Sequence, residues 1–159
     1  MHLPDTLNAS ILSSQLDHFF ALAGPKLLSL DSESDPAKGS PVFTVAGKYT
    51  SRGWTEWTQG FQYGCLVLQF DATDDGEYLE RGVQRIHDFM APHISHVGVH
   101  DHGFNNLSTY GNVLRLAKEG RIPMADDARA FYELAIKVSG AVQAARWSRI
   151  ADGTGYIHS

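Results

Sequence analysis

The chain has 159 residues, 43% of them hydrophobic and 19% charged, which indicates one globular domain and excludes a disordered chain. A net charge of −5 without a basic stripe disfavours partners such as nucleic acid or an anionic membrane. Cys65 is the only cysteine, so no disulfide forms within the chain, and with neither a signal peptide nor roughly 18 consecutive apolar residues we expect a cytoplasmic protein.

The first third of the chain predicts one helix and a long irregular stretch. The helix begins at Asp5 or Thr6 and ends at Gly24-Pro25, because proline interrupts the helical hydrogen bonds. One face of it is apolar and carries Leu12, Leu16, Phe19, Phe20 and Ala23. Residues 30–41 read as a loop and residues 41–49 as extended chain, with a turn at Gly47.

The middle of the chain predicts two helices. Residues 57–70 are apolar on nearly every side, which is typical of a helix buried at the centre of a fold. Asp74-Asp75-Gly76 supplies an N-cap for the next helix, which runs from Leu79 to Met90 and ends at Pro92. A loop over residues 93–106 follows.

Two further helices complete the pattern. Residues 107–119 form a short helix closed by Gly120, and the last helix begins at Asp126 or Asp127. One side of the last helix carries Phe131, Leu134, Val138, Val142 and Ala145, which we expect to face the core. The fold class is therefore all-α with about five helices, and their succession as hairpins suggests a helical array or toroid.

The run His100-Asp101-His102-Gly103-Phe104-Asn105 is the strongest candidate for a functional site, because loops held between rigid helices often carry catalytic groups. Asp101 can act as an acid or base near neutral pH if its surroundings move its pKa. The alternative is that Asp101 only caps a turn, which is the usual role of aspartate near glycine.

Four histidines, His93, His96, His100 and His102, lie within ten residues. His100 and His102 with a third ligand could bind zinc or another transition metal, although no distant ligand identifies itself. The alternative is a polar loop whose histidines make hydrogen bonds.

Aromatic residues surround this run, and an aromatic ring beside a carboxylate is a common way to hold a sugar. We expect Trp57, at the start of the buried helix, to belong to such a site. Phe61 and Tyr63 are expected in the core, and Cys65 is expected to pack there rather than to act as a nucleophile.

Several segments in order resemble the unsaturated glucuronyl hydrolases of glycoside hydrolase family 88. The resemblance covers about two thirds of the chain, from Trp54 to Ser159, and its most specific part is His-Asp-x-Gly-Phe at His100–Phe104. The matching segments are Trp57–Phe61 with Gly64 and Leu66–Leu68, Asp75–Tyr78, His100–Phe104, Tyr110–Asn112, Arg115-Leu116, Ala144-Ala145 and Gly155–Ser159.

The resemblance implies an (α/α)6 barrel, a six-hairpin toroid of twelve helices, without a metal or organic cofactor. It implies an oligosaccharide substrate with a 4,5-unsaturated uronic acid at its non-reducing end, and hydration of the vinyl ether double bond. By the same resemblance Asp101 is one of two catalytic aspartates, and Trp57, His100 and Phe104, with Asn105 beside them, contact the substrate. His102 departs from the family, which commonly has an apolar residue there.

Twelve helices need on the order of 300 residues. We therefore expect residues 1–159 to be the N-terminal part of a single (α/α)6 domain, truncated before the second catalytic aspartate, with an open edge of apolar helix and little activity alone. The alternative hypothesis is a non-enzymatic helical module that binds a metal or a partner through the His93–His102 loop.

Overall fold

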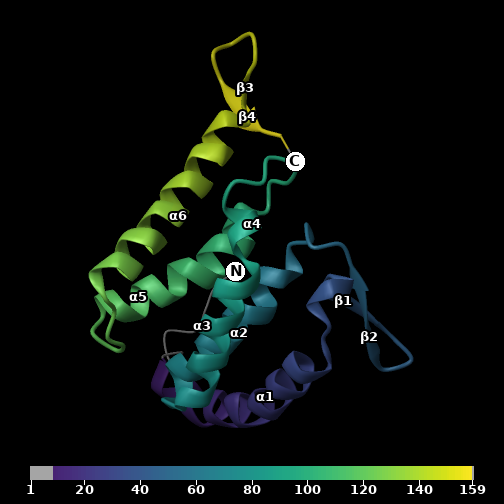
Figure 1. Ribbon diagram of the computed structural model, residues 1–159, viewed down its shortest axis with the longest axis vertical. Helices are drawn as coiled ribbons and strands as arrows, with labels where there is room; N and C mark the ends of the chain where they lie inside the picture. The colour runs from purple at the N-terminus through teal and green to yellow at the C-terminus, as the bar shows by residue number, and fades with distance from the viewer. Residues whose placement is uncertain (1–8, 159) are drawn as a thin grey trace.

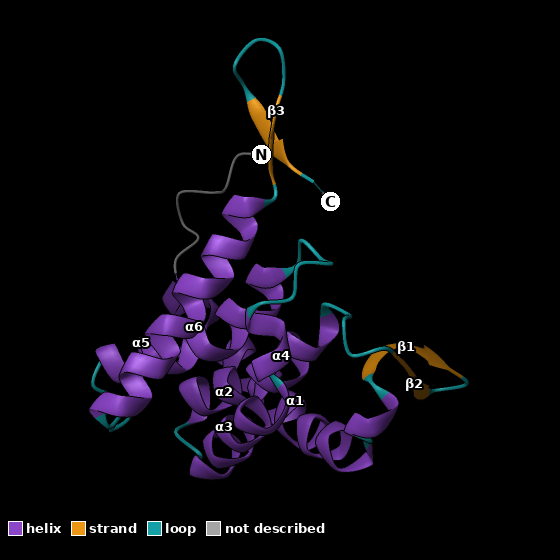
Figure 2. Cartoon of the chain, turned by 45° about the horizontal axis from the view of Figure 1, so that its top comes forward, coloured by secondary structure: helices purple, strands orange, loops and turns teal. Residues whose placement is uncertain are grey.

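The computed structural model describes residues 9–158, which are mostly helical, with two small antiparallel hairpins (Figures 1 and 2). The prediction of a mainly helical protein is confirmed at that level. The helices are α1 (Ser13–Glu33), α2 (Thr58–Thr73), α3 (Gly76–Phe89), α4 (Ala91–Ile94), α5 (Asn112–Lys118) and α6 (Asp126–Ala145), with 3-10 turns η1 (Ala9–Leu12) and η2 (Pro36–Lys38) and a π-helix, η3 (Gly103–Gly111). The hairpins pair β1 (Ser40–Val45) with β2 (Lys48–Arg52), and β3 (Trp147–Arg149) with β4 (Gly155–Ile157).

Helix α2 lies at the centre of the fold, as its composition predicts. It packs against α1, α3, η3 and α5. Its core-facing side chains, Tyr63, Leu66 and Val67, join a buried cluster with Ile86 of α3 and Tyr110 of η3. Burial is not complete around the helix, however, because Phe61 and Leu68 are exposed on its opposite side.

Two glycines let α2 and η3 approach backbone to backbone. A Cβ atom on Gly60 would lie 2.3 Å from the Phe104 carbonyl oxygen, and one on Gly64 would lie 2.5 Å from the Ser108 carbonyl oxygen. Both distances are too short for any side chain. The spacing of four residues places the two glycines on one face of α2, and that face fixes the position of η3.

The predicted end of the first helix at Gly24-Pro25 is wrong, because α1 continues to Glu33. Proline removes one helical donor, but tertiary contacts hold both sides of the interruption. Gln69 Nε2 of α2 donates to the Phe20 carbonyl oxygen at 3.0 Å, and Asp31 near the end of α1 pairs with Arg85 of α3.

The predicted apolar face of this helix is also wrong in part. Leu12, Leu16 and Phe19 are exposed. The residues of α1 that pack against the core are Leu27 and Leu28, beyond Pro25. The predicted start at Asp5 or Thr6 lies outside the described residues.

The predicted loop over residues 30–41 is shorter than expected, since α1 takes its beginning and β1 takes its end. The extended segment with a turn at Gly47 is confirmed as the β1–β2 hairpin. Ala46 and Gly47 both have positive φ, 50° and 76°, as a two-residue hairpin turn of this hand requires.

The cap at Asp75 is confirmed, because its Oδ1 accepts a hydrogen bond from the Glu77 N–H at 3.1 Å at the start of α3. Pro92 does not end α3, which stops at Phe89. Pro92 instead occupies the first turn of α4, where a helix needs no N–H donor. The predicted loop over residues 93–106 therefore shrinks to residues 95–102. Gly120, with φ of 73°, follows α5 as predicted.

Helix α6 begins at Asp126 as predicted, but it turns a different face to the core. Its buried residues are Tyr132, Ala135 and Ser139, whereas Phe131 and Leu134 are exposed. The face of α6 that is buried is the one that makes polar contacts. Its Ser139 forms hydrogen bonds with Asn106 of η3 and with His102 in the loop before η3. Within residues 9–158, no helix is both long enough and apolar enough to cross a bilayer.

Candidate functional site

Residues 95–102, which we call the histidine loop, connect α4 to η3 and are fastened to the C-terminal end of α6. Gln143 Nε2 donates to the His100 carbonyl oxygen at 2.6 Å, and the Arg146 guanidinium donates to the Val97 carbonyl oxygen. These bonds hold the loop by its backbone. Its side chains at His100 and Asp101 are therefore left for other contacts.

Asp101 lies where the histidine loop enters η3. Its carbonyl oxygen accepts from the Asn105 N–H at 3.1 Å, which makes residues 101–105 a helical turn. The carboxylate is 14% exposed, and its Oδ1 lies 3.4 Å from Nε2 of the half-exposed His100. The carboxylate is therefore largely shielded from water, with a histidine nitrogen as its neighbour.

Three aromatic rings form an exposed group, which we call the aromatic cluster. Trp57 at the N-cap of α2, Phe61 of α2 and Phe104 of η3 have ring centroids 5.3–5.7 Å apart, and their exposed fractions are 42%, 37% and 48%. Trp57 and Phe104 thus come together as expected for a site. Phe61 belongs with them, so its predicted place in the core is wrong, whereas Tyr63 is buried as predicted.

Asn105, the remaining predicted substrate contact, points into the protein. Its side chain is 1% exposed, and its Oδ1 accepts a hydrogen bond from the Gly60 N–H at 3.0 Å. That donor belongs to the first turn of α2, where backbone N–H groups have no helical partner. Asn105 therefore joins η3 to α2 rather than facing a substrate.

His102 is buried and has both ring nitrogens engaged. Nε2 lies 2.6 Å from the His96 carbonyl oxygen, and Nδ1 lies 2.9 Å from Ser139 Oγ. Because a carbonyl only accepts, Nε2 carries the proton and Ser139 donates to Nδ1. Asn106 Nδ2 donates to Ser139 Oγ at 3.1 Å and to the His93 carbonyl oxygen, so one buried network ties the histidine loop to α4 and α6.

His93 is buried beneath Trp54, whose ring lies 5.3 Å from it, centroid to centroid. His93 Nε2 donates to Gln59 Oε1 at 2.6 Å, while Nδ1 has no hydrogen-bond partner among the described residues. Burial, followed by the neighbouring His96 and His102, lowers the pKa of His93 from 6.5 to about 4. This histidine is therefore neutral at physiological pH.

The histidine group does not have the arrangement of a metal site. Over residues 9–158, no three His, Cys, Asp or Glu side chains are grouped so that they could hold a metal ion. His102 has no nitrogen to offer, since both are used in the buried network. His93 and His102 use ring nitrogens in buried hydrogen bonds, whereas His96 lies against the Trp54 ring and His100 lies beside Asp101.

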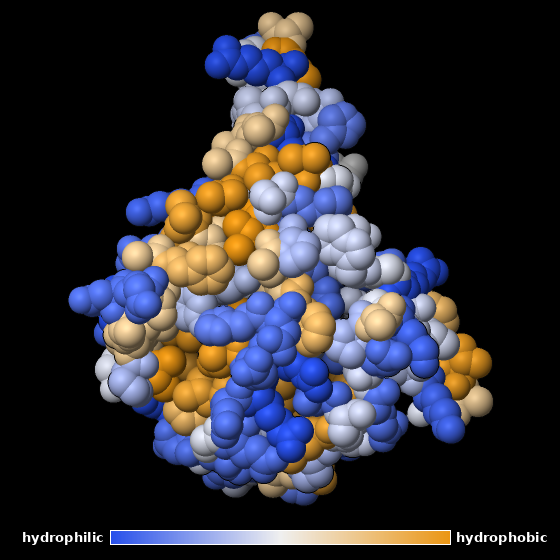
Figure 3. Space-filling model, viewed as in Figure 1, coloured by the Kyte–Doolittle hydropathy of each residue, from blue (hydrophilic) through white to orange (hydrophobic). Residues whose placement is uncertain are grey.

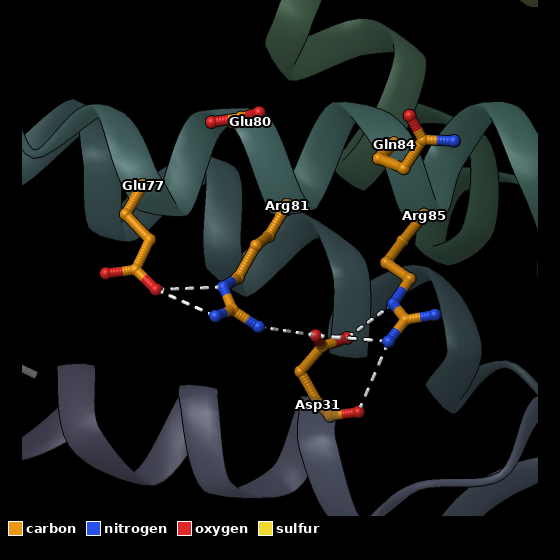
Figure 4. Close-up of a pocket in the computed structure, with 6 residues that line it drawn as sticks. All are labelled: Asp31, Glu77, Glu80, Arg81, Gln84 and Arg85. Carbon is orange, nitrogen blue, oxygen red and sulfur yellow. Dashed lines mark hydrogen bonds and ion pairs between the residues drawn. The ribbon is translucent and has the colours of Figure 1, made fainter.

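Three of the hollows on the described surface are lined by residues other than Asp101 and the aromatic cluster. One holds a charged group between α1 and α3 (Figure 4). In it, buried Asp31 accepts from Arg85 at 2.7 Å and lies 3.6 Å from Arg81, which also pairs with Glu77. The carboxylate and the two guanidinium groups satisfy one another, so this group joins the two helices.

Several other residues of the matching segments stabilise the fold and do not face the candidate site. Tyr110 is fully buried, Asp75 caps α3, and Arg115 pairs with Asp71 of α2. Sequence reasoning missed the buried partners Gln59, Asn106 and Ser139. No local signal marks them, because each acts on a residue far along the chain.

No protein-family model, curated protein or solved structure matches this chain.

Proposed function

We propose that this chain is part of a glycoside hydrolase that acts on oligosaccharides ending in a 4,5-unsaturated uronic acid, by hydration of the double bond. Asp101 is the acid-base group, and the aromatic cluster is one wall of the sugar site. The observation that carries the proposal is that a mostly buried carboxylate, Asp101, lies just before η3 and three residues from Phe104 of the exposed aromatic cluster.

The geometry of that turn supports a shared site. Asp101 and Phe104 are three residues apart on one helical turn, so their side chains lie on neighbouring positions of the same face. Phe104 in turn contacts Trp57 and Phe61. A sugar ring covering these faces would bury apolar surface that is now in water, while its hydroxyl groups and carboxylate reach His100 and Asp101.

A second catalytic carboxylate is proposed to come from outside the described residues. Asp126 and Asp127 begin α6, whereas the histidine loop is bonded to Gln143 near its other end. At 1.5 Å per residue that separation is about 24 Å, too far for joint chemistry. Asp152 is engaged in its own turn, where it accepts from the Thr154 N–H and hydroxyl.

The partial toroid is proposed on the same basis. Helices α2 and α3 follow one another through a tight connection capped by Asp75, and α5 and α6 are joined through Gly120. Two successive helical pairs, of which α3 and α5 pack on the central α2, fit the first hairpins of an (α/α)6 barrel. The exposed apolar side chains of α1 and α2 fit a fold with an open edge.

Binding of an unsaturated uronic acid disaccharide tests the site without requiring turnover. Trp57→Ala and Phe104→Ala should each weaken binding by about tenfold, since each removes a ring from the wall. Trp147→Ala, in the β3–β4 hairpin and somewhat more exposed at 52%, is the matched control. Calorimetric titration measures all four proteins. Equal affinity of the wild type and both cluster variants would remove the proposal.

Asp101→Asn separates chemistry from binding. It should keep disaccharide affinity within a few-fold while abolishing any loss of ultraviolet absorbance from the unsaturated sugar. Since one carboxylate alone is expected to be a poor catalyst, the assay is also run on a longer natural chain if one exists. Near-normal turnover by the Asn variant would contradict the role of Asp101.

A further inference from the structure

One flank of α6 carries an apolar stripe that the described structure covers only in part. The helix has 20 residues, yet only Tyr132, Ala135 and Ser139 are buried. Leu134 is 57% exposed, and Figure 3 shows apolar residues gathered along the visible face of α6. We call Phe131, Leu134, Val138, Val142 and Ala145 the α6 stripe; Val138 and Val142 are half-buried and the other three exposed.

The total exposed area is larger than that of a compact monomer. The chain has 9905 Å² of accessible surface. A folded monomer of 17.5 kDa is expected to have about 7,900 Å². The difference of about 2,000 Å² is spread over the whole chain, and the exposed residues of the α6 stripe are one part of it.

The charges at the two ends of the stripe indicate which complex. Asp126 and Asp127 begin α6, and Arg149 lies just beyond its C-terminal end. None of these three side chains has an ion-pair partner within residues 9–158. A second α6 laid antiparallel would bring an acidic end against a basic end twice, and it would also pair the two helix dipoles favourably.

We propose that α6 pairs antiparallel with α6 of a second copy of this chain, around a two-fold axis near Val138. In that arrangement Phe131 lies opposite the partner's Ala145, Leu134 opposite the partner's Val142, and Asp127 near the partner's Arg149. Such an interface is isologous, so one stripe supplies both of its halves.

The proposed dimer does not depend on the proposed function. The α6 stripe shares no residue with the aromatic cluster or with Asp101, so a variant of one can leave the other unchanged. Self-association is measured without sugar, and sugar binding is measured at dilutions where the dimer dissociates. Failure of either proposal is therefore seen separately.

Sedimentation velocity over a concentration series tests the interface. Wild-type protein should shift from monomer to dimer as concentration rises, and Leu134→Glu should weaken self-association by tenfold or more, because it places two charges in the apolar centre. Leu22→Glu is the matched control, since Leu22 is 52% exposed and belongs to α1, a helix that lies away from α6 (Figure 1). Circular dichroism checks that both variants remain folded.

Charge exchange tests the orientation. Asp127→Arg and Arg149→Asp should each weaken the dimer, and the double variant should restore it, because it rebuilds both ion pairs with reversed sign. A wild type that stays monomeric at every soluble concentration would overturn the proposal and leave the stripe to another occupant. So would equal effects of Leu22→Glu and Leu134→Glu, or a double variant no better than the singles.

Discussion

Asn105 Oδ1 and the Gly60 N–H are joined by a buried hydrogen bond of 3.0 Å that links η3 to the first turn of α2. The same two residues are also in backbone contact, since a Cβ on Gly60 would lie 2.3 Å from Asn105 Cα. This pair places Phe104 of η3 against Trp57 at the start of α2. The motif residues thus divide into those that build the surface and those that hold it in position.

Gly60→Ala should destabilise the protein by about 3 kcal/mol or more, because the new methyl group meets backbone atoms that cannot turn aside. Urea unfolding measures the change. The matched control is Gly140→Ala in α6, where a Cβ meets nothing within 4 Å. That variant should stabilise by roughly 0.5–1 kcal/mol through helix propensity. A Gly60 variant as stable as the wild type would contradict the close packing of α2 on η3.

Asn105→Ala should cost about 1–3 kcal/mol of unfolding free energy, since it leaves the buried Gly60 N–H without an acceptor. Sugar affinity of the folded variant should stay close to that of the wild type, because the side chain faces inward. Chemical denaturation and calorimetric titration on the same preparation check both statements. A large loss of affinity with unchanged stability would instead return Asn105 to the substrate side.

Asp31→Ala should destabilise the protein by about 3 kcal/mol, because it removes the shared partner of Arg81 and Arg85 between α1 and α3 (Figure 4). Glu77→Ala is the comparison, since Glu77 also pairs with Arg81 but is half-exposed and should cost less than about 1 kcal/mol. Thermal and urea unfolding of the two variants should rank them in this order. Equal costs would mean that Asp31 contributes no more than a surface ion pair.

His93 should make stability fall with acid. The pKa of His93 is about 4 in the folded protein, against an ordinary value of 6.5 that applies to the unfolded chain. Between these two pH values the unfolded chain binds a proton at His93 and the folded chain does not. The contribution is complete above pH 6.5, declines as the pH falls to 4 and changes no further below it. The total is roughly 3 kcal/mol.

His93→Gln should flatten this pH dependence, whatever its effect at neutral pH, since glutamine does not titrate. Unfolding free energies of the wild type and the variant are compared from pH 7 to pH 4, with the half-exposed His100→Gln as control. Parallel curves for the wild type and His93→Gln would show that burial of His93 does not shape the acid response.

The sequence correctly predicted those features of the fold that depend on residues close together in the chain. The Asp75 cap, the turn at Gly47 and the start of α6 depend on neighbouring residues, and the structure confirms them. The end of α1 could not be predicted from Pro25, because Gln69 and Arg85 sustain the helix from 49 and 54 residues away along the chain.

The candidate site was predictable to a similar extent. Aromatic character pointed to Trp57 and Phe104, but hydrophobicity alone placed Phe61 in the core, since composition does not say which face of α2 is left open. Asn105 points inward because its side chain bonds to the Gly60 N–H where α2 meets η3. His93 is buried with Gln59 as its hydrogen-bond partner, 34 residues earlier in the chain. Neither partner could be identified from the neighbouring sequence.

Because Gly103–Gly111 is wound as a π-helix, the number of residues in this segment determines where the aromatic cluster lies. Each residue of an α-helix advances about 100° around its axis, so loss of one residue from this segment would let it rewind as ordinary helix and rotate everything before it relative to α5. Phe104 would leave Trp57, and the histidine loop would leave the end of α6. Relatives that carry a deletion at this place should therefore have lost the aromatic surface even where every ring is still encoded.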